Sequence, residues 1–189
     1  MPKVTQEHLG ARRAEILDGA RRAFAEHGYE GTTVARLEEA TGLSRGAIFH
    51  YFENKTDLFV ELAIEMNTRF TDLIVESGLH DAFRALTAES PEWLAVLIET
   101  EGRLRHDEDF VRRFEAKAAD VTPRAREWFA QQQAEGKLRA DISSVELGRF
   151  TTSLLNGLAL RVAGGDPFEI DAMLRLLDDA IAPRRRRAS

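Results

Sequence analysis

The sequence contains no cysteine, which excludes disulfide bonds and thiolate chemistry. No apolar run approaches the roughly 20 residues that a membrane-spanning helix needs. The first residues, MPKVTQEHLGARRAEIL, lack the apolar stretch of a secretion signal, so a cytoplasmic location is expected. No P-loop, dinucleotide-binding or nucleophile-elbow motif is present, and the five histidines lack metal-ligand spacing, which argues against an enzyme. These histidines are His8, His27, His50, His80 and His106.

The net charge of −6 is unevenly distributed along the 189 residues. Residues 1–55 carry eight basic and eight acidic side chains, so the remainder carries the whole excess of negative charge. A less acidic N-terminal part is compatible with phosphate contact, although charge alone does not establish binding to a nucleic acid.

Proline and glycine are also scarce, and the apolar residues recur at helical spacing almost throughout. The pattern predicts one helix that stops at Gly28, a second between an N-cap at Thr33 and Gly42, and a third capped by Ser44 that carries Ile48. No alternating run of β-branched residues predicts a strand. The expected fold class is therefore all-α.

A much longer helix is expected to begin after a cap at Asn54 and to continue to Gly78. Breaks at glycine and first-turn prolines then delimit the remaining helices. The expected ranges are 79–89, 91–105, 107–135, 143–163 and 167–182.

Residues 33–55 have the organisation of a helix-turn-helix, in which a tight turn at Gly42 sets two short helices at a steep angle. The outer face of the second helix would enter the major groove of DNA. Arg45 offers a planar fork for guanine or phosphate, and Gly46 lets the backbone approach closely. The residues expected to contact DNA are Thr33, Arg36, Ser44, Arg45, Gly46, His50, Tyr51 and Lys55.

The run AFAEHGYEGTTVARLEEATGLSRGAIFHYFENKTDLF resembles the DNA-binding domain of the TetR family of repressors. The shared elements are Phe24 with Gly28-Tyr29, the pair Thr32-Thr33, the turn at Gly42, and FHYF followed by Lys55. Glu38 departs from the pattern, because a small residue is common there. The resemblance implies an N-terminal three-helix DNA-binding domain, residues 1–55, and a ligand-binding and dimerisation domain, residues 56–189.

Two C-terminal segments support a homodimer independently of the resemblance. Each has an apolar stripe that could join its equivalent in a four-helix contact about a two-fold axis. The stripes are Leu147, Phe150, Leu154, Leu158 and Val162, and Ile170, Met173, Leu174, Leu177 and Ile181. The alternative is that these residues only close the core of a single chain.

A ligand site is expected in the C-terminal part. Glu99, Arg103, Arg126 and Asn156 are polar residues on helices with apolar stripes, and together they would suit a small anionic metabolite. The alternative is that each is a surface residue or part of an internal ion pair. The stretch RLEEATGLSRGAIFH, with LIETEGRLRHDEDF and EGKLRAD, resembles actinobacterial repressors of aconitase, which implies a tricarboxylate effector with a metal ion. No cofactor is expected to be required, apart from a divalent metal that accompanies such an effector. No residue is assigned as a metal ligand.

The expected function is therefore sequence-specific binding to operator DNA by a homodimeric regulator that a small-molecule effector releases. Two questions stay open. The chain could be a helical interaction or ligand-binding module without DNA binding, and the sequence does not distinguish a repressor from an activator.

Overall fold

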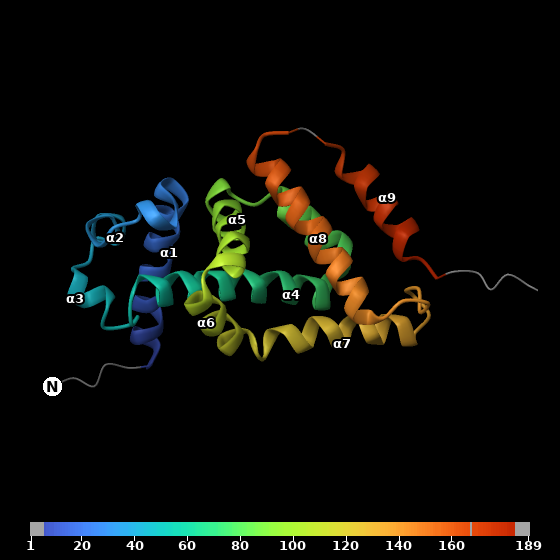
Figure 1. Ribbon diagram of the computed structural model, residues 1–189, viewed down its shortest axis with the longest axis horizontal. Helices are drawn as coiled ribbons and strands as arrows, with labels where there is room; N and C mark the ends of the chain where they lie inside the picture. The colour runs from blue at the N-terminus through green and yellow to red at the C-terminus, as the bar shows by residue number, and fades with distance from the viewer. Residues whose placement is uncertain (1–5, 167, 184–189) are drawn as a thin grey trace, which may run out of the picture. The chain divides into compact units, whose positions relative to one another are not determined.

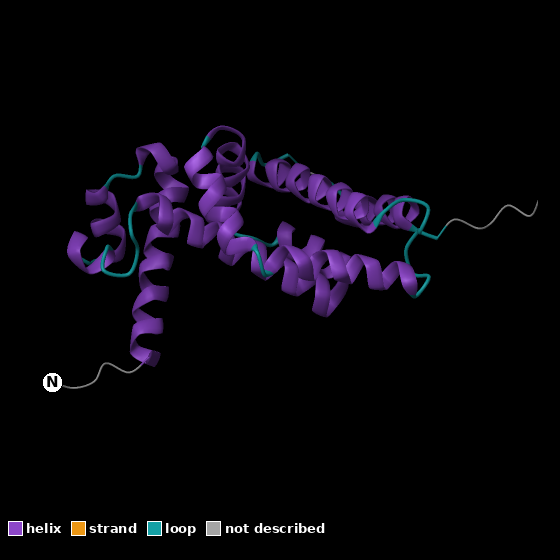
Figure 2. Cartoon of the chain, turned by 60° about the horizontal axis from the view of Figure 1, so that its bottom comes forward, coloured by secondary structure: helices purple, strands orange, loops and turns teal. Residues whose placement is uncertain are grey.

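The computed structural model describes residues 6–166 and 168–183, and every regular element in these ranges is an α-helix (Figures 1 and 2). The all-α prediction is confirmed. None of the helices in the described ranges combines the length and the apolar character needed to cross a membrane. In chain order the helices are α1 (Gln6–Gly31), α2 (Val34–Thr41), α3 (Arg45–Ile48), α4 (Lys55–Thr87), α5 (Pro91–His106), α6 (Glu108–Ala118), α7 (Val121–Ala134), α8 (Ser144–Ala163) and α9 (Ile170–Ile181).

Contacts divide the chain into two compact units. The first combines residues 1–66 with 90–117, and the second combines residues 67–89 with 118–189. The helix-turn-helix therefore shares its unit with the first part of α4 and with α5 and α6, which the sequence assigned to the C-terminal domain. The functional boundary between residues 55 and 56 stays a prediction, since compactness does not show which residues bind DNA or ligand.

In the first unit α1 packs against both α2 and α5. Its buried face contributes Ile16 and Phe24 to a core that also holds Leu37, Phe59 and Phe110. The Phe59 ring lies 4.9 Å from the Phe24 ring and 5.8 Å from the Phe110 ring, measured between centroids. Burial of aromatic surface thus holds α6 against α4 and α1, and Val96 of α5 is buried in the same core.

The local signals of the helix-turn-helix are confirmed by the structure. Thr33 and Ser44 accept hydrogen bonds from the backbone N–H groups of Arg36 and Ala47, so they cap α2 and α3. Gly42 closes α2 in the left-handed region at φ 69°, where a side chain would be strained. The third helix is shorter than expected, because α3 ends at Ile48 and a turn follows.

The second unit contains the rest of α4 with α7, α8 and α9. Gly78, at φ 85°, interrupts α4 where a break was predicted. The aromatic ring of Phe129 on α7 packs beside Gly148 on α8, where an added Cβ would lie 3.7 Å from the ring. Arg139 donates from its backbone N–H to Ile181 and from its guanidinium to Ala180, and so it holds the end of α9.

The prediction of one helix over 107–135 is wrong. The structure has α6 and α7 in that range, separated by a turn at residues 119–120. Pro123 lies in the first turn of α7, and it accounts for the break because its ring would clash with the carbonyl of residue 119 in a continuous helix. The expected start of the last helix at Pro167 lies outside the described residues.

Candidate nucleic-acid interface

The recognition segment, residues 44–52, has one side buried in the core and the opposite side exposed. Ile48 and Phe52 are buried in the core of the first unit, whereas Arg45, Gly46 and His50 are exposed. An added Cβ at Gly46 would meet nothing within 4 Å. The exposed side of the segment therefore presents the Arg45 guanidinium, the backbone at Gly46 and the His50 imidazole. The buried apolar side chains on the opposite side fix its position.

Arg45 is held through its backbone. Its N–H donates to the Glu38 carboxylate at 2.6 Å, which satisfies an N-terminal amide of α3 and explains why an acidic residue can stand at this position of α2. None of the described residues forms an ion pair or hydrogen bond with the Arg45 guanidinium, so all five of its N–H donors can reach an external partner.

Three predicted contact residues are engaged in local structure. The side-chain oxygens of Thr33 and Ser44 cap their helices, and Arg36 donates from its guanidinium to the backbone carbonyl of Gly31. All three residues are exposed. Their remaining donors suit phosphate oxygens, which position a protein on DNA and do not specify sequence.

Lys55 and Tyr51 are half-buried. The Lys55 ammonium donates to the Tyr29 carbonyl at 2.9 Å and lies 4.2 Å from the centroid of the Tyr29 ring. Burial lowers the pKa of Lys55, the charge of Glu30 opposes this shift, and the charge of Arg103 adds to it. Lys55 therefore has a structural role that sequence reasoning missed. Its remaining N–H donors are available to contact phosphate.

The structure separates the predicted ligand residues into two pairs. Glu99 and Arg103 lie four residues apart on α5 in the first unit, with 3.7 Å between Oε1 and Nε. The Arg103 guanidinium lies 3.2 Å from the Tyr29 ring centroid and also pairs with Glu30 and Asp107. This pair therefore lies against the C-terminal end of α1, at Tyr29 and Glu30. Arg126, exposed on α7, and Asn156, half-buried on α8, belong to the second unit.

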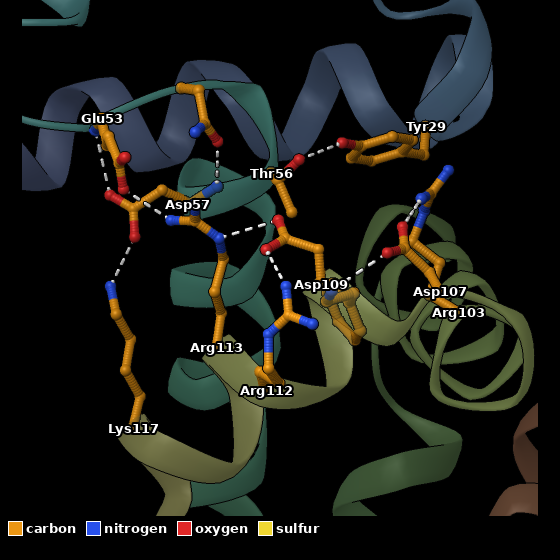
Figure 3. A network of polar contacts seen from close by, with 12 residues as sticks. Tyr29, Glu53, Thr56, Asp57, Arg103, Asp107, Asp109, Arg112, Arg113 and Lys117 are labelled. Atoms are coloured by element: carbon orange, nitrogen blue, oxygen red, sulfur yellow. Dashed lines mark hydrogen bonds and ion pairs between the residues drawn. The ribbon is translucent and has the colours of Figure 1, made fainter.

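A network of ion pairs that the sequence analysis did not anticipate lies beside the recognition segment (Figure 3). Arg113 and Lys117 of α6 contact Glu53, which directly precedes the α4 cap, and Asp57 and Glu61, which lie in the first turns of α4. Burial disfavours ionisation of Asp57, but hydrogen bonds from Lys117 and from the Glu53 N–H outweigh it and lower the pKa of this carboxyl. The four-residue spacing within each charged set was visible in the sequence, but the pairing between the sets was not.

No group of three or more metal-ligating side chains occurs within residues 6–166 and 168–183. The first unit thus offers an anchored segment whose exposed Arg45 guanidinium and bare backbone at Gly46 can fit a groove of DNA.

Known proteins resemble this chain over nearly its whole length. It is 40% identical over 184 residues to the HTH-type transcriptional repressor Rv1474c of Mycobacterium tuberculosis, with 96% of this chain and 98% of that protein covered. It is 39% identical, also over 184 residues, to the HTH-type transcriptional repressor AcnR of Corynebacterium diphtheriae, with 96% and 97% covered. Among solved structures, Salmonella enterica GusR superposes with a TM-score of 0.76 over 95% of this chain and 98% of that one, at 20% identity.

Two sequence families match consecutive parts of the chain. Residues 16–62 match the bacterial regulatory proteins of the tetR family, and residues 75–184 match the C-terminal domain of BetI-type transcriptional repressors. The first match covers the capped helix-turn-helix and the start of α4, and the second covers α5 to α9. With its DNA-binding fold and its full-length relatives, the chain belongs to the TetR family of bacterial regulatory proteins.

Proposed function

We propose that the protein is a cytoplasmic, homodimeric transcriptional repressor that binds operator DNA through the recognition segment. The observation that carries this proposal is the contrast within that segment between the free guanidinium of Arg45 and the fully buried side chain of Ile48. A fork of donors on a rigid helix suits base edges in the major groove. Repression, as opposed to activation, is inferred from relatives that are named as repressors.

A dimer would supply two recognition segments to two half-sites. Half of the residues in the apolar stripes predicted for this contact are buried within the chain, including Leu147, Leu174 and Leu177. The alternative role in the core of one chain therefore fits these residues. Phe150 and Leu160 of α8 and Leu176 of α9 remain exposed by 42%, 60% and 63%. We assign the dimer contact to this outer apolar set, because such large exposed side chains commonly mark an interface.

We propose a tricarboxylate that carries a divalent metal as the effector, on the basis of the resemblance to aconitase repressors. The carboxylates of the effector would provide most of the oxygen ligands that such a metal prefers. The structure divides the predicted contact residues between two units, so the proposed contacts are either Arg126 and Asn156 in the second unit or Glu99 and Arg103 on α5 in the first. No cofactor is proposed for DNA binding itself.

The DNA-binding proposal is tested by selection from a random library of duplexes with the purified full-length protein. We expect enrichment of a two-fold symmetric motif whose half-sites lie one helical turn, about 10 base pairs, or a multiple of it apart. Enrichment of no sequence would instead favour a helical interaction module without DNA binding.

The effector proposal is tested with the selected duplex. Citrate with Mg²⁺ should weaken binding by about 1–3 kcal/mol, the usual range of a coupling free energy, whereas citrate with excess chelator should not. By reciprocity the selected duplex should weaken the binding of citrate and Mg²⁺ by the same factor. Operator affinity that is unchanged at saturating citrate and Mg²⁺ would reject the tricarboxylate.

A further inference from the structure

Two rows of opposite charge face each other beside the recognition segment (Figure 3). Glu53, Asp57 and Glu61 recur at intervals of four residues, with Glu53 just before α4 and the other two in its first turns, and Arg113 and Lys117 have the same spacing on α6. Arg113 Nη1 lies 2.6 Å from Glu53 Oε2, and Lys117 Nζ lies 2.7 Å from Asp57 Oδ1 and also contacts Glu61. Since side chains four residues apart share one face of a helix, Asp57 and Glu61 lie on one face of α4, and Arg113 and Lys117 lie on one face of α6. Together with Glu53, which precedes α4, the two rows form a ladder of ion pairs between the start of α4 and α6.

The ladder holds Glu53 at two points. Its carboxylate accepts from Arg113, and its backbone N–H donates to Asp57 Oδ2 at 3.1 Å. Asp57 is fixed in turn by Lys117. Glu53 directly precedes Asn54, the residue that caps α4, and directly follows Phe52, the buried end of the recognition segment. Glu53 therefore lies at the junction between the recognition segment and α4, where its position is fixed from two sides.

The negative charge of Glu53 is unfavourable beside a surface proposed to bind DNA. A carboxylate next to a DNA-binding surface repels phosphate, so an acidic side chain here weakens binding unless it contributes in another way. Its side chain is 68% exposed, so it does not fill the core. Its observed partners are Arg113 of α6, which contacts its carboxylate, and Asp57 in the first turn of α4, which accepts a hydrogen bond from its backbone N–H.

We propose that Arg113 and Glu53 are positioning residues for DNA recognition. The α6 guanidinium fixes the junction between the recognition segment and α4, and thereby sets the angle at which Arg45 and Gly46 meet the groove. This inference rests on the proposed DNA binding and adds that α6, although it follows the DNA-binding domain in sequence by 50 residues or so, contributes to the affinity of that domain.

The first test compares Arg113→Met with Arg112→Met. Arg112 lies on the same helix and pairs with Asp109 of α6 only, so it controls for the loss of one positive charge. Binding to the duplex selected by the wild-type protein is measured by fluorescence anisotropy, with the active fraction determined by stoichiometric titration. We expect Arg113→Met to weaken binding roughly five- to tenfold more than Arg112→Met, as for residues coupled through a contact. Equal effects of the two variants would overturn the proposal.

The second test uses the sign of the effect of Glu53→Gln, whose exposed position does not threaten folding. Removal of a negative charge near DNA should strengthen binding if the carboxylate only repels phosphate, whereas loss of a positioning contact should weaken it. Glu39→Gln, an exposed acid on α2 with no described partner, gives the effect of charge alone. Weaker binding by Glu53→Gln, with no further loss in the double variant with Arg113→Met, supports the proposal. Tighter binding by Glu53→Gln contradicts it.

These outcomes are distinct from failure of the proposed function. If the wild-type protein selects no duplex, DNA binding itself is rejected. If it selects a duplex and the Arg113 and Glu53 variants bind it like their controls, DNA binding stands and the positioning role is rejected.

Discussion

Gly46 lowers the stability of α3 but favours DNA binding. It lies inside α3 on the exposed side, where alanine is the better helix former by about 0.5–1 kcal/mol. Gly46→Ala should therefore raise the unfolding temperature and weaken operator binding, because the added methyl group stands between the backbone and the groove. Thermal melts and anisotropy titrations measure the two effects. Gly102→Ala on α5, also helical and open, should show only the stabilisation. Tighter or unchanged DNA binding by Gly46→Ala would mean that the backbone does not approach the duplex.

Lys55 has a structural role and a proposed phosphate-binding role. The salt dependence of DNA binding by Lys55→Ala separates the two. Lys55→Ala should lower the unfolding temperature, because the Tyr29 carbonyl loses a partly buried partner. It should also weaken binding to operator and random DNA alike and make the slope of log K against log salt shallower by about 1. Arg105→Ala, exposed on α5, controls for the loss of charge. An unchanged slope would restrict Lys55 to its structural role.

At the scale of elements, the acidic row at the start of α4 makes stability depend on pH. The folded-state pKa of Asp57 is lowered from its ordinary value of 3.8. The ionised carboxylate therefore stabilises the fold above that value, and the contribution is lost as the pH falls through the folded-state pKa. Asp57→Asn should destabilise the protein by about 1–2 kcal/mol at pH 7, and by progressively less below pH 3.8.

Chemical denaturation at several pH values measures this difference. Asp81→Asn, an exposed residue of α4 with no described partner, should have little effect at any pH. A difference for Asp57→Asn that does not depend on pH would show that its interactions do not require the charge.

The elements also show what sequence reasoning can reach. Thr33, Gly42, Ser44 and Asn54 act through hydrogen bonds and backbone conformation within a few residues, so the limits of α2 and the starts of α3 and α4 were predictable. The break between α6 and α7 was also local, and the significance of Pro123 was missed. The contacts of Arg113 with Glu53 and of Arg103 with Tyr29 depend on how distant segments pack, and no local signal predicts them.

On the scale of the whole molecule, the division of contacts changes how the family resemblance is interpreted. The sequence match for the DNA-binding part ends at residue 62, but the unit that holds the recognition segment also contains α5 and α6. Glu99 and Arg103, predicted from sequence as ligand contacts, pair with each other, and Arg103 also pairs with Glu30 of α1, the helix that packs against α2. An effector that bound Glu99 and Arg103 would compete with these ion pairs. Such competition gives a physical route from ligand binding to the DNA-binding part of the unit.

The central claim is that the outer face of the recognition segment reads DNA, and Arg45→Ala tests it most directly. At physiological salt the wild-type protein should bind its selected duplex at least about 10³-fold tighter than a shuffled duplex of equal composition. Loss of the only guanidinium on that face should cost about 1–3 kcal/mol of discrimination per half-site, and Arg105→Ala should leave the ratio unchanged. For two half-sites the account predicts that Arg45→Ala lowers the ratio by about 30-fold or more. Retention of the wild-type ratio by Arg45→Ala would contradict it.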